Sequence, residues 1–426
     1  MKTAYINCTI LDGSEQMKPI PQMTIIEEDG KIVAIERSSK KTVNYQVIDL
    51  EGRYLMPGLI NLHIHLPSSG KPTKKQTDAT KLVKLLTSTA LSRAILVGIC
   101  KNSAKTQLMS GVTTVRTVGG ITNVDTKIRD SILMGKIVGP RMLAANMAVS
   151  VPGGHMAGSL AYEASSLEEA CHDVEQIIKD HPDLIKLMIT GGVLDAKTKG
   201  EPGVLRMPPD YVKGCCEVAH KSGYPVAAHA ESPEGVLVAL ENGVDTVEHG
   251  SALDENLVSL FKAKKSSLIC TISPALPIAL FNKNISHSSE VTQFNGKVVM
   301  DGIISGVKTA LANDMPVGLG TDSGCPFVTH YDMWRELVYF HKYVNVSNSF
   351  ALYTATKRNA MIANIGTVTG SIEVGKSADF LITEGNPLED LSALRTPYMV
   401  VTCGRRFKHP KIKKYADVEN ELDKWL

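Results

Sequence analysis

The sequence lacks the features that mark membrane-spanning, secreted and nucleic-acid-binding proteins. It has no apolar run of about 18 residues or more, which a membrane helix would need. Its first residues, "MKTAYINCTILDG", show no continuous apolar stretch and no small-residue cleavage site, and they indicate a strand rather than a signal peptide. The 46 basic and 44 acidic side chains leave a net charge of +2, which favours neither nucleic acid nor an anionic membrane. We therefore expect a small-molecule substrate, with no nucleic acid and no membrane as partner.

The cysteines give no pattern typical of disulfides. The eight of them are scattered, none forms a CxxC pair, and the adjacent Cys215 and Cys216 are poorly placed for a mutual disulfide. A reducing, cytoplasmic location is the simplest interpretation. We further expect a homo-oligomer.

What the sequence does contain is a long alternating middle between two β-rich ends. The length of 426 residues suits a large barrel with an appendage. Residues 1–56 consist of short β-type runs separated by Asp-Gly and Glu-Gly turns, and residues 366–426 show the same pattern. We predict one small β-sandwich domain built from both of these ends.

Residues 57–365 alternate between apolar β-type runs, such as "LINLHIHL" and "YPVAAHA", and stretches with helical spacing, such as "SLEEACHDVEQIIKD". Strands that alternate with helices indicate a parallel sheet. Eight such runs fit an α/β fold of the distorted (β/α)8 TIM-barrel type. The active site of such a barrel lies at the C-terminal ends of its strands.

Six side chains that can bind a metal or carry a proton lie at the ends of these predicted strands. They are His63 and His65 in the first run, Lys186 in the fourth, His229 in the fifth, His249 in the sixth and Asp322 in the eighth. Side chains two apart on a strand face the same way, about 7 Å from each other, so both histidines of "LHIHL" can reach one cation. A single buried histidine is more often a packed core residue, but this set favours a metal site.

Lys186 is unusual because it lies inside the apolar run "DLIKLMIT". One interpretation is an ion pair with a neighbouring carboxylate, since an unpaired buried amine is costly. The other is an amine whose pKa is lowered by burial and by nearby metal charge. Such an amine could take up carbon dioxide and become a carbamate, which could bridge two metal ions.

The ordered set HxH, Lys, His, His, Asp resembles the amidohydrolase superfamily. The segments "PGLINLHIHL", "KLMITGGV", "PVAAHAESPEG", "GVDTVEHGS" and "GLGTDSG" are similar, more narrowly, to the branch of Xaa-Pro dipeptidases and imidazolonepropionase-like hydrolases. The resemblance covers nearly the whole chain. It implies two divalent ions, which we expect to be Zn²⁺. It assigns one ion to His63, His65 and Asp322, the other to His229 and His249, and a bridge to carboxylated Lys186.

The resemblance also implies roles in the reaction. Asp322 would take the proton of a metal-bridging hydroxide and pass it to the leaving amine. His155, in "VPGGHMAG", would polarise the substrate carbonyl. His330 and Tyr331 follow the eighth strand and are candidates for substrate contact, although a surface role is equally compatible with their positions.

Glu231 departs from the dipeptidase-like pattern, which has a tyrosine that meets the terminal carboxylate of the substrate. A carboxylate here would repel that group and leave room for a neutral or cationic substrate. The alternative is a helix N-terminal carboxylate, because "ESPEG" opens the next predicted helix.

We therefore expect a metal-dependent hydrolase that cleaves a C–N bond of an amide, peptide-like, lactam or carbamate substrate. A dipeptidase or an N-acyl amino acid hydrolase would be an example. A deaminase of the same superfamily and a non-enzymatic scaffold relative are the alternatives. The lysine argues against a deaminase, because deaminases of the superfamily typically use one metal and lack a carboxylated lysine. The complete set of ligand positions argues against a scaffold.

Overall fold

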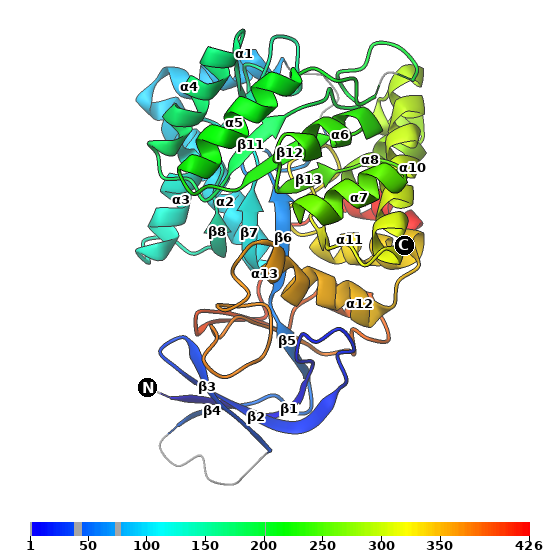
Figure 1. Ribbon diagram of the computed structural model, residues 1–426. Coiled ribbons are helices and arrows are strands. Elements are labelled where there is room, and N and C mark those ends of the chain that lie inside the picture. The colour runs from blue at the N-terminus through cyan, green and yellow to red at the C-terminus, as the bar shows by residue number, and fades with distance from the viewer. Residues whose placement is uncertain (1, 38–44, 73–77, 201) are drawn as a thin grey trace.

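The computed structural model describes residues 2–37, 45–72, 78–200 and 202–426, and confirms an α/β fold with parallel sheets. Figure 1 shows a β-rich region built from both ends of the chain below a larger region of strands and helices. The chain ends beside α11 (Met333–Tyr339) in the larger region, where Arg335 pairs with Glu419 and Asp423 near the C-terminus (Figure 1).

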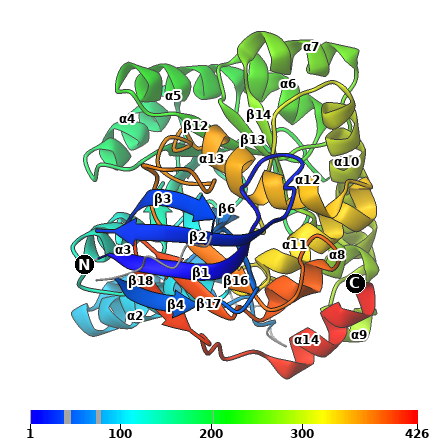
Figure 2. The ribbon, with the colours of Figure 1, turned by 90° about the horizontal axis from the view of Figure 1, so that it is seen from below.

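Both ends of the chain contribute to one sheet of eight strands, in the order β18-β17-β16-β5-β1-β2-β3, with β4 also paired to β1. In Figure 2 the blue N-terminal strands lie beside the orange and red C-terminal ones. The described strands from the two ends of the chain form one sheet. The sandwich of two sheets therefore stays a prediction. Its strands are β1 (Thr3–Ile10), β2 (Ile20–Glu28), β3 (Lys31–Arg37), β4 (Gln46–Asp49), β5 (Tyr54–Pro57), β16 (Phe380–Thr383), β17 (Met399–Thr402) and β18 (Arg405–Lys408).

The middle of the chain forms two parallel sheets, one in the order β10-β9-β11-β12-β13-β14-β15 and one in the order β6-β7-β8. A single isolated parallel bridge, Ile64 to Ser323, joins them. The pairings of the described residues therefore do not close a barrel. These strands are β6 (Leu59–Ile64), β7 (Val112–Thr117), β8 (Arg141–Leu143), β9 (Ala148–Ser150), β10 (Ala161–Glu163), β11 (Ile185–Met188), β12 (Val226–Ala230), β13 (Thr246–His249), β14 (Ser267–Cys270) and β15 (Val317–Leu319).

The gap between these sheets has a local cause. The third predicted run, residues 141–149, divides into β8 and β9. Asn146 lies between them with a left-handed φ of 63°, a conformation that interrupts an extended strand and that asparagine tolerates better than most residues. Its side-chain oxygen accepts a hydrogen bond from the Thr126 N–H at 3.1 Å. The break is therefore fixed by the start of the neighbouring helix.

Helices surround the parallel strands (Figure 1). They begin at capping residues that the sequence supplies: Ser166 and Ser232 cap α4 and α6 by accepting from Glu169 and Gly235 N–H groups. The main helices are α1 (Ala79–Ser88), α2 (Ala90–Met109), α3 (Val124–Leu133), α4 (Leu167–Ile178), α5 (Pro209–Lys221), α6 (Pro233–Glu241), α7 (Glu255–Lys264), α8 (Ile272–Leu280), α10 (Glu290–Ala312), α11 (Met333–Tyr339) and α14 (Ala416–Leu422). The shorter ones are α9 (Lys283–Ser286), α12 (Asn348–Tyr353) and α13 (Asn359–Ile362).

Within the described residues, no single helix has the length and apolar composition to cross a membrane, although α1 and α2 pass that test as a pair bent by 115°. Every residue of β6, β7, β11, β12 and β13 is buried. The ends of these buried strands carry the polar residues described next.

Candidate metal centre

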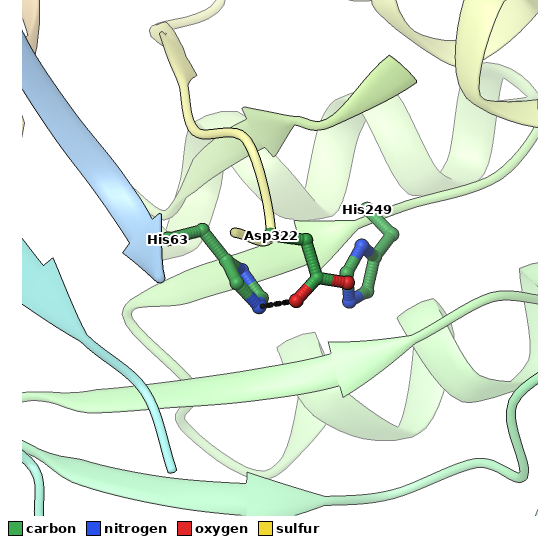
Figure 3. A group of neighbouring side chains, drawn as sticks. All are labelled: His63, His249 and Asp322. Carbon is green, nitrogen blue, oxygen red and sulfur yellow. Dashed lines mark ion pairs between the residues drawn. The ribbon is translucent and has the colours of Figure 1, made fainter. Parts of the chain in front are cut away.

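The six predicted ligands come together from the ends of β6, β12 and β13, from within β11 and from just after β15. The rings of His63 and His65 are 5.4 Å apart, and the ring of His249 is 4.8 Å from those of His63 and His229. Asp322 Oδ1 lies 3.5 Å from His63 Nε2 and 3.1 Å from His65 Nε2. Figure 3 shows His63, Asp322 and His249 pointing toward one another from separate elements.

Two groups of ligand atoms are compact enough to hold an ion. Those of His63, His249 and Asp322 lie within 4.8 Å of one another, and so do those of His229, Glu231 and His249. The second group includes Glu231, which the sequence analysis considered for substrate contact or as a helix N-terminal carboxylate but not as a metal ligand. His249 belongs to both groups, so the two possible ion positions would be neighbours with this histidine between them.

The backbone at two of these residues departs from strand geometry. His249 has a φ of 67° and Asp322 a φ of 59°, both in the left-handed region. Such values cost free energy outside glycine and persist where the surroundings enforce them, often at functional sites. The surroundings are visible here: the Asp322 N–H donates to the His63 carbonyl at 2.8 Å, and the Gly250 N–H donates to the Ala230 carbonyl at 3.0 Å.

The Nδ1 atoms of three histidines form hydrogen bonds that hold their rings in place. His63 Nδ1 lies 2.8 Å from Glu248 Oε2, His65 Nδ1 lies 2.8 Å from the Gly119 carbonyl oxygen, and His249 Nδ1 lies 2.7 Å from Thr271 Oγ1. A carbonyl or carboxylate oxygen only accepts, so the protons of His63 and His65 are on Nδ1 and their Nε2 atoms are free to bind a metal. Such support of ligand histidines is common in metal sites.

Glu248 is one of the residues that the sequence analysis missed. Its carboxylate accepts from Arg116 at 2.7 Å and from Thr246 Oγ1 at 2.8 Å in addition to its contact with His63. Burial acts to raise its pKa, but the Arg116 charge and the His63 hydrogen bond hold that pKa well below the usual range. The buried carboxylate is therefore ionised and fixes the His63 ring.

Lys186 is 1% exposed, and its Nζ atom has no hydrogen-bond partner within the described part of the chain. The ion pair considered from the sequence is thus not seen. Burial lowers the pKa of Lys186 to about 8. At pH 7 this leaves about a tenth of the amine neutral, and the neutral amine is the form that can take up carbon dioxide. His229 Nε2 also lacks a hydrogen-bond partner among the described residues, and Asp322 Oδ1 accepts no hydrogen bond although His65 Nε2 lies 3.1 Å away. Buried polar atoms without hydrogen bonds are rare, and three such atoms in one cluster indicate a site that can hold an ion.

A small cavity of about 60 Å³ opens over the His229 and Asp322 side. Its walls are mostly apolar and come from residues 192–194, α8 and α10, with Met156 from a neighbouring loop. Among the described residues, its polar lining consists of His155, His229, Glu231, His249, Asp322 and Cys325, without lysine or arginine. The cavity thus offers carboxylates and imidazoles but no cationic side chain.

His155 lies where the sequence analysis expected it, beside the cluster. Its ring stacks on that of His229, with centroids 4.3 Å apart and an interplanar angle of 14°. Its Nδ1 atom lies 2.6 Å from Asp195 Oδ2. Asp195 was not predicted, because the loop after β11 shows no motif that would single it out.

Glu231 lies at the cavity rather than at the helix cap. Ser232 is the capping residue of α6, and Glu234 is the acidic residue of its first turn. The Glu231 Oε2 atom is buried and has no partner among the described residues. Burial, followed by the charge of Asp322, raises the pKa of Glu231 to about 8.

His330 and Tyr331 line a different cavity, of about 280 Å³. His330 Nε2 lies 2.7 Å from the Ser68 carbonyl oxygen, and the Tyr331 hydroxyl accepts from the Tyr415 N–H at 2.8 Å. The structure does not bring these two side chains to the cavity over the cluster, where substrate contact was predicted.

The chain belongs to the amidohydrolase family, whose model matches residues 54–409. It is therefore an enzyme of the class that acts on carbon–nitrogen bonds. Two solved structures share its fold over nearly the full length. A candidate prolidase from Bifidobacterium longum is 36% identical, with a TM-score of 0.87 and coverage of 99% of this chain and 98% of that one. A Xaa-Pro dipeptidase with bound methionine in its active site is 28% identical, with a TM-score of 0.82 and coverage of 96% and 100%.

Curated relatives are more distant. An ochratoxinase from Aspergillus niger is 25% identical over 391 residues, covering 85% of this chain and 77% of the relative. A 5-methylthioadenosine/S-adenosylhomocysteine deaminase from Bacillus cytotoxicus is 23% identical over 406 residues, covering 89% and 85%. These matches establish the family, whereas the names of the relatives point to different substrates.

Proposed function

We propose that this protein is a metal-dependent hydrolase that cleaves an amide-like C–N bond of a small molecule. The observation that carries the proposal is Lys186, a buried amine without a partner among the described residues, beside four histidines and an aspartate. A lone buried amine is costly, so its presence calls for a chemical role. A carbamate on this amine would supply the negative charge that the cluster otherwise lacks at that position.

The donor set suits two divalent ions, with zinc as our first choice because nitrogen and oxygen donors fit it. His63, His65 and Asp322 would hold one ion, His229 and His249 the other, and carboxylated Lys186 would bridge them. The atoms without hydrogen bonds to described residues, His229 Nε2 and Asp322 Oδ1, support this assignment. When bound, such ions lower the pKa of water and polarise a carbonyl group.

Asp322 would move the proton in the reaction. Its side chain borders both the cluster and the cavity. Burial acts to raise its pKa, but the neighbouring histidines, His63 first, hold it well below the usual range. The carboxylate is therefore ionised before the reaction. It can take a proton from the attacking water and give it to the leaving amine.

His155 would orient the substrate carbonyl from the cavity wall. Its Nδ1 atom faces Asp195, which leaves Nε2 as the ring atom available to a ligand. Because Nδ1 already shares a proton with the carboxylate, the ring can donate from Nε2 only when doubly protonated.

The substrate should lack a free carboxylate at the end that meets Glu231. No lysine or arginine lines the cavity among the described residues, so neither side chain is there to pair with a carboxylate beside Glu231. The apolar walls favour an apolar or aromatic group instead. Neutral amides, lactams and carbamates, or substrates with an amine near Glu231, fit better than ordinary dipeptides do.

The proposed site also depends on how the strands close and on which residues form the catalytic unit. We propose that β6 and the segment after β15 meet through the Ile64–Ser323 bridge as part of a distorted (β/α)8 barrel. Residues 57–365 would form this catalytic unit, and residues 1–56 and 366–426 would form the β-rich unit. Ser323 directly follows Asp322, so this closure would set the position of the proposed proton carrier.

Deamination is the second candidate, because the Bacillus relative carries that activity in its name. The two are separated by product analysis. The zinc-loaded enzyme would be given N-acyl amino acids, dipeptides, lactams and aryl carbamates, with aminopurine nucleosides as the deaminase arm and Lys186→Ala as a control. We expect amide or carbamate cleavage that Lys186→Ala lacks. Ammonia release from the nucleosides alone would contradict the proposal.

A further inference from the structure

The His155 side chain is paired with a carboxylate that the proposed reaction does not use. His155 lies in the loop between β9 and β10, and Asp195 lies 40 residues later in the loop after β11. The distance between His155 Nδ1 and Asp195 Oδ2 is 2.6 Å, and the two side chains are 17% and 33% exposed. This is the one hydrogen bond that the His155 ring makes to a described residue.

The Asp195 carboxylate is itself held in place. Its Oδ2 atom also accepts from the Gly192 N–H at 2.8 Å, and the Asp195 N–H donates to the Gly192 carbonyl at 3.0 Å. Burial acts to raise the pKa of Asp195, but the hydrogen bond and charge of His155 outweigh it, and the pKa is lowered. The acceptor is therefore ionised and is fixed by a tight turn of residues 192–195.

The His155 ring also has little room to move. One contact is the stacked ring of His229, with centroids 4.3 Å apart. Another is the backbone at Gly192, where an added Cβ would lie 2.8 Å from both Cε1 and Nδ1 of His155. Only glycine at this position lets the ring lie where it does.

We propose that Asp195 is a positioning residue for His155: it fixes the ring so that Nε2 faces the cavity over the metal cluster. The inference rests on the proposed role of His155 toward the substrate carbonyl. Without Asp195, stacking and the Gly192 backbone would still confine the plane of the ring. A half-turn about the Cβ–Cγ bond keeps that plane but exchanges Nε2 with Cε1, so neither contact fixes which atom faces the cavity.

The test is a double-mutant cycle with Asp195→Ala and His155→Ala. The probe is an aryl carbamate or N-acyl amino acid that the wild-type enzyme cleaves. We expect Asp195→Ala to lower kcat about 10- to 100-fold, as for other residues that orient an active-site group, with KM and metal content unchanged. The double variant should be no slower than His155→Ala, because residues that act through one another are not additive. Asp195→Glu, which keeps the carboxylate, should recover part of the loss.

The chain offers a matched control. His220 Nε2 and Asp245 Oδ2 form a second histidine–aspartate pair at 2.8 Å, about half exposed and outside the cluster. Asp245→Asn should leave kcat unchanged. Gly192→Ala is an independent probe, because it displaces the ring without removing a charge. Like Asp195→Ala, it should lower kcat.

A structural readout needs no substrate. Nitrogen-15 NMR of histidine-labelled protein reports which ring nitrogen carries the proton, and His155→Ala assigns the His155 signals. We expect them to shift in Asp195→Ala and not in Asp245→Asn. Unchanged signals, or an additive double variant, would overturn the inference. If His155→Ala keeps the wild-type rate, the proposed role of His155 fails as well, a result distinct from failure of Asp195→Ala alone.

Discussion

The Nδ1 atom of His63 lies 2.8 Å from Oε2 of Glu248, and the other oxygen of that carboxylate accepts from Arg116 at 2.7 Å. Glu248 directly precedes His249, yet both side chains approach His63. Consecutive residues of a regular strand point to opposite faces. The left-handed φ of 67° at His249 removes that constraint. The end of β13 thus supplies the proposed ligand His249 and also Glu248, whose hydrogen bond holds the proposed ligand His63.

Glu248→Gln should weaken metal binding. An amide can accept from Arg116 but cannot offset its charge, and it holds His63 less firmly. We expect metal affinity to fall about 10- to 100-fold, as when other supporting residues are removed. The free energy of unfolding should fall by about 3 to 5 kcal/mol, because a buried guanidinium loses its partner. Metal titration and chemical denaturation measure these changes. The exposed Glu241→Gln is the control, and equal affinities would contradict the account.

Lys186 should take up carbon dioxide in a pH-dependent way. Burial lowers its pKa to about 8, so the neutral amine that forms a carbamate grows as the pH rises toward that value and changes little above it. At constant dissolved carbon dioxide, we expect uptake to quicken about tenfold per pH unit below the pKa. Carbon-13 NMR with labelled carbon dioxide measures the carbamate signal. A signal that persists in Lys186→Ala would contradict the assignment.

Asp322→Asn should separate binding from turnover. The asparagine carbonyl can still face a metal ion, but it cannot carry a proton. We expect much of the metal to remain and turnover to fall about 100- to 10,000-fold, the usual effect of losing one proton carrier. Metal analysis and steady-state kinetics on the same preparation measure both. A wild-type rate would mean that another group, such as His155, is the base.

Glu231→Tyr should change substrate preference. Above the Glu231 pKa of about 8, the variant removes a negative charge from a cavity whose described lining has no lysine or arginine. At such a pH, substrates with a terminal carboxylate should gain relative to neutral amides. Below it Glu231 is mostly protonated, so the gain should be smaller. Each 1.4 kcal/mol of repulsion removed corresponds to about tenfold in the ratio of kcat/KM values. Competition between a dipeptide and its C-terminal amide measures that ratio. Glu234→Gln, in the first turn of α6, is the matched control. A ratio that stays within about twofold would refute the role of Glu231.

Much of the site could be predicted because it follows local periodicity. His63 and His65 are two apart at the end of a buried strand, and the other proposed ligands lie in or directly after strands whose apolar runs are plain in the sequence. Glu248 and Asp195 could not be found in this way. Their roles depend on contacts with His63 and His155, which are 185 and 40 residues distant. No local pattern encodes such contacts.

The fold was predicted with similar limits. The parallel strands follow from the alternation of β-type and helical runs, and the meeting of the two chain ends follows from the β-type runs at both of them. The division of the third strand at Asn146 depends on a hydrogen bond from Thr126, which only the folded chain reveals. His330 illustrates the same limit, because its contact with the Ser68 carbonyl joins segments 262 residues apart.

The central claim is a two-ion centre bridged by modified Lys186, and metal stoichiometry tests it most directly. The wild-type protein, produced with ample zinc and purified without chelators, would be analysed by plasma mass spectrometry beside Lys186→Ala. The account predicts close to two ions per chain in the wild type and a clear loss in the variant. A wild-type value near one would contradict the bridge, and a value near zero would contradict the metal centre itself.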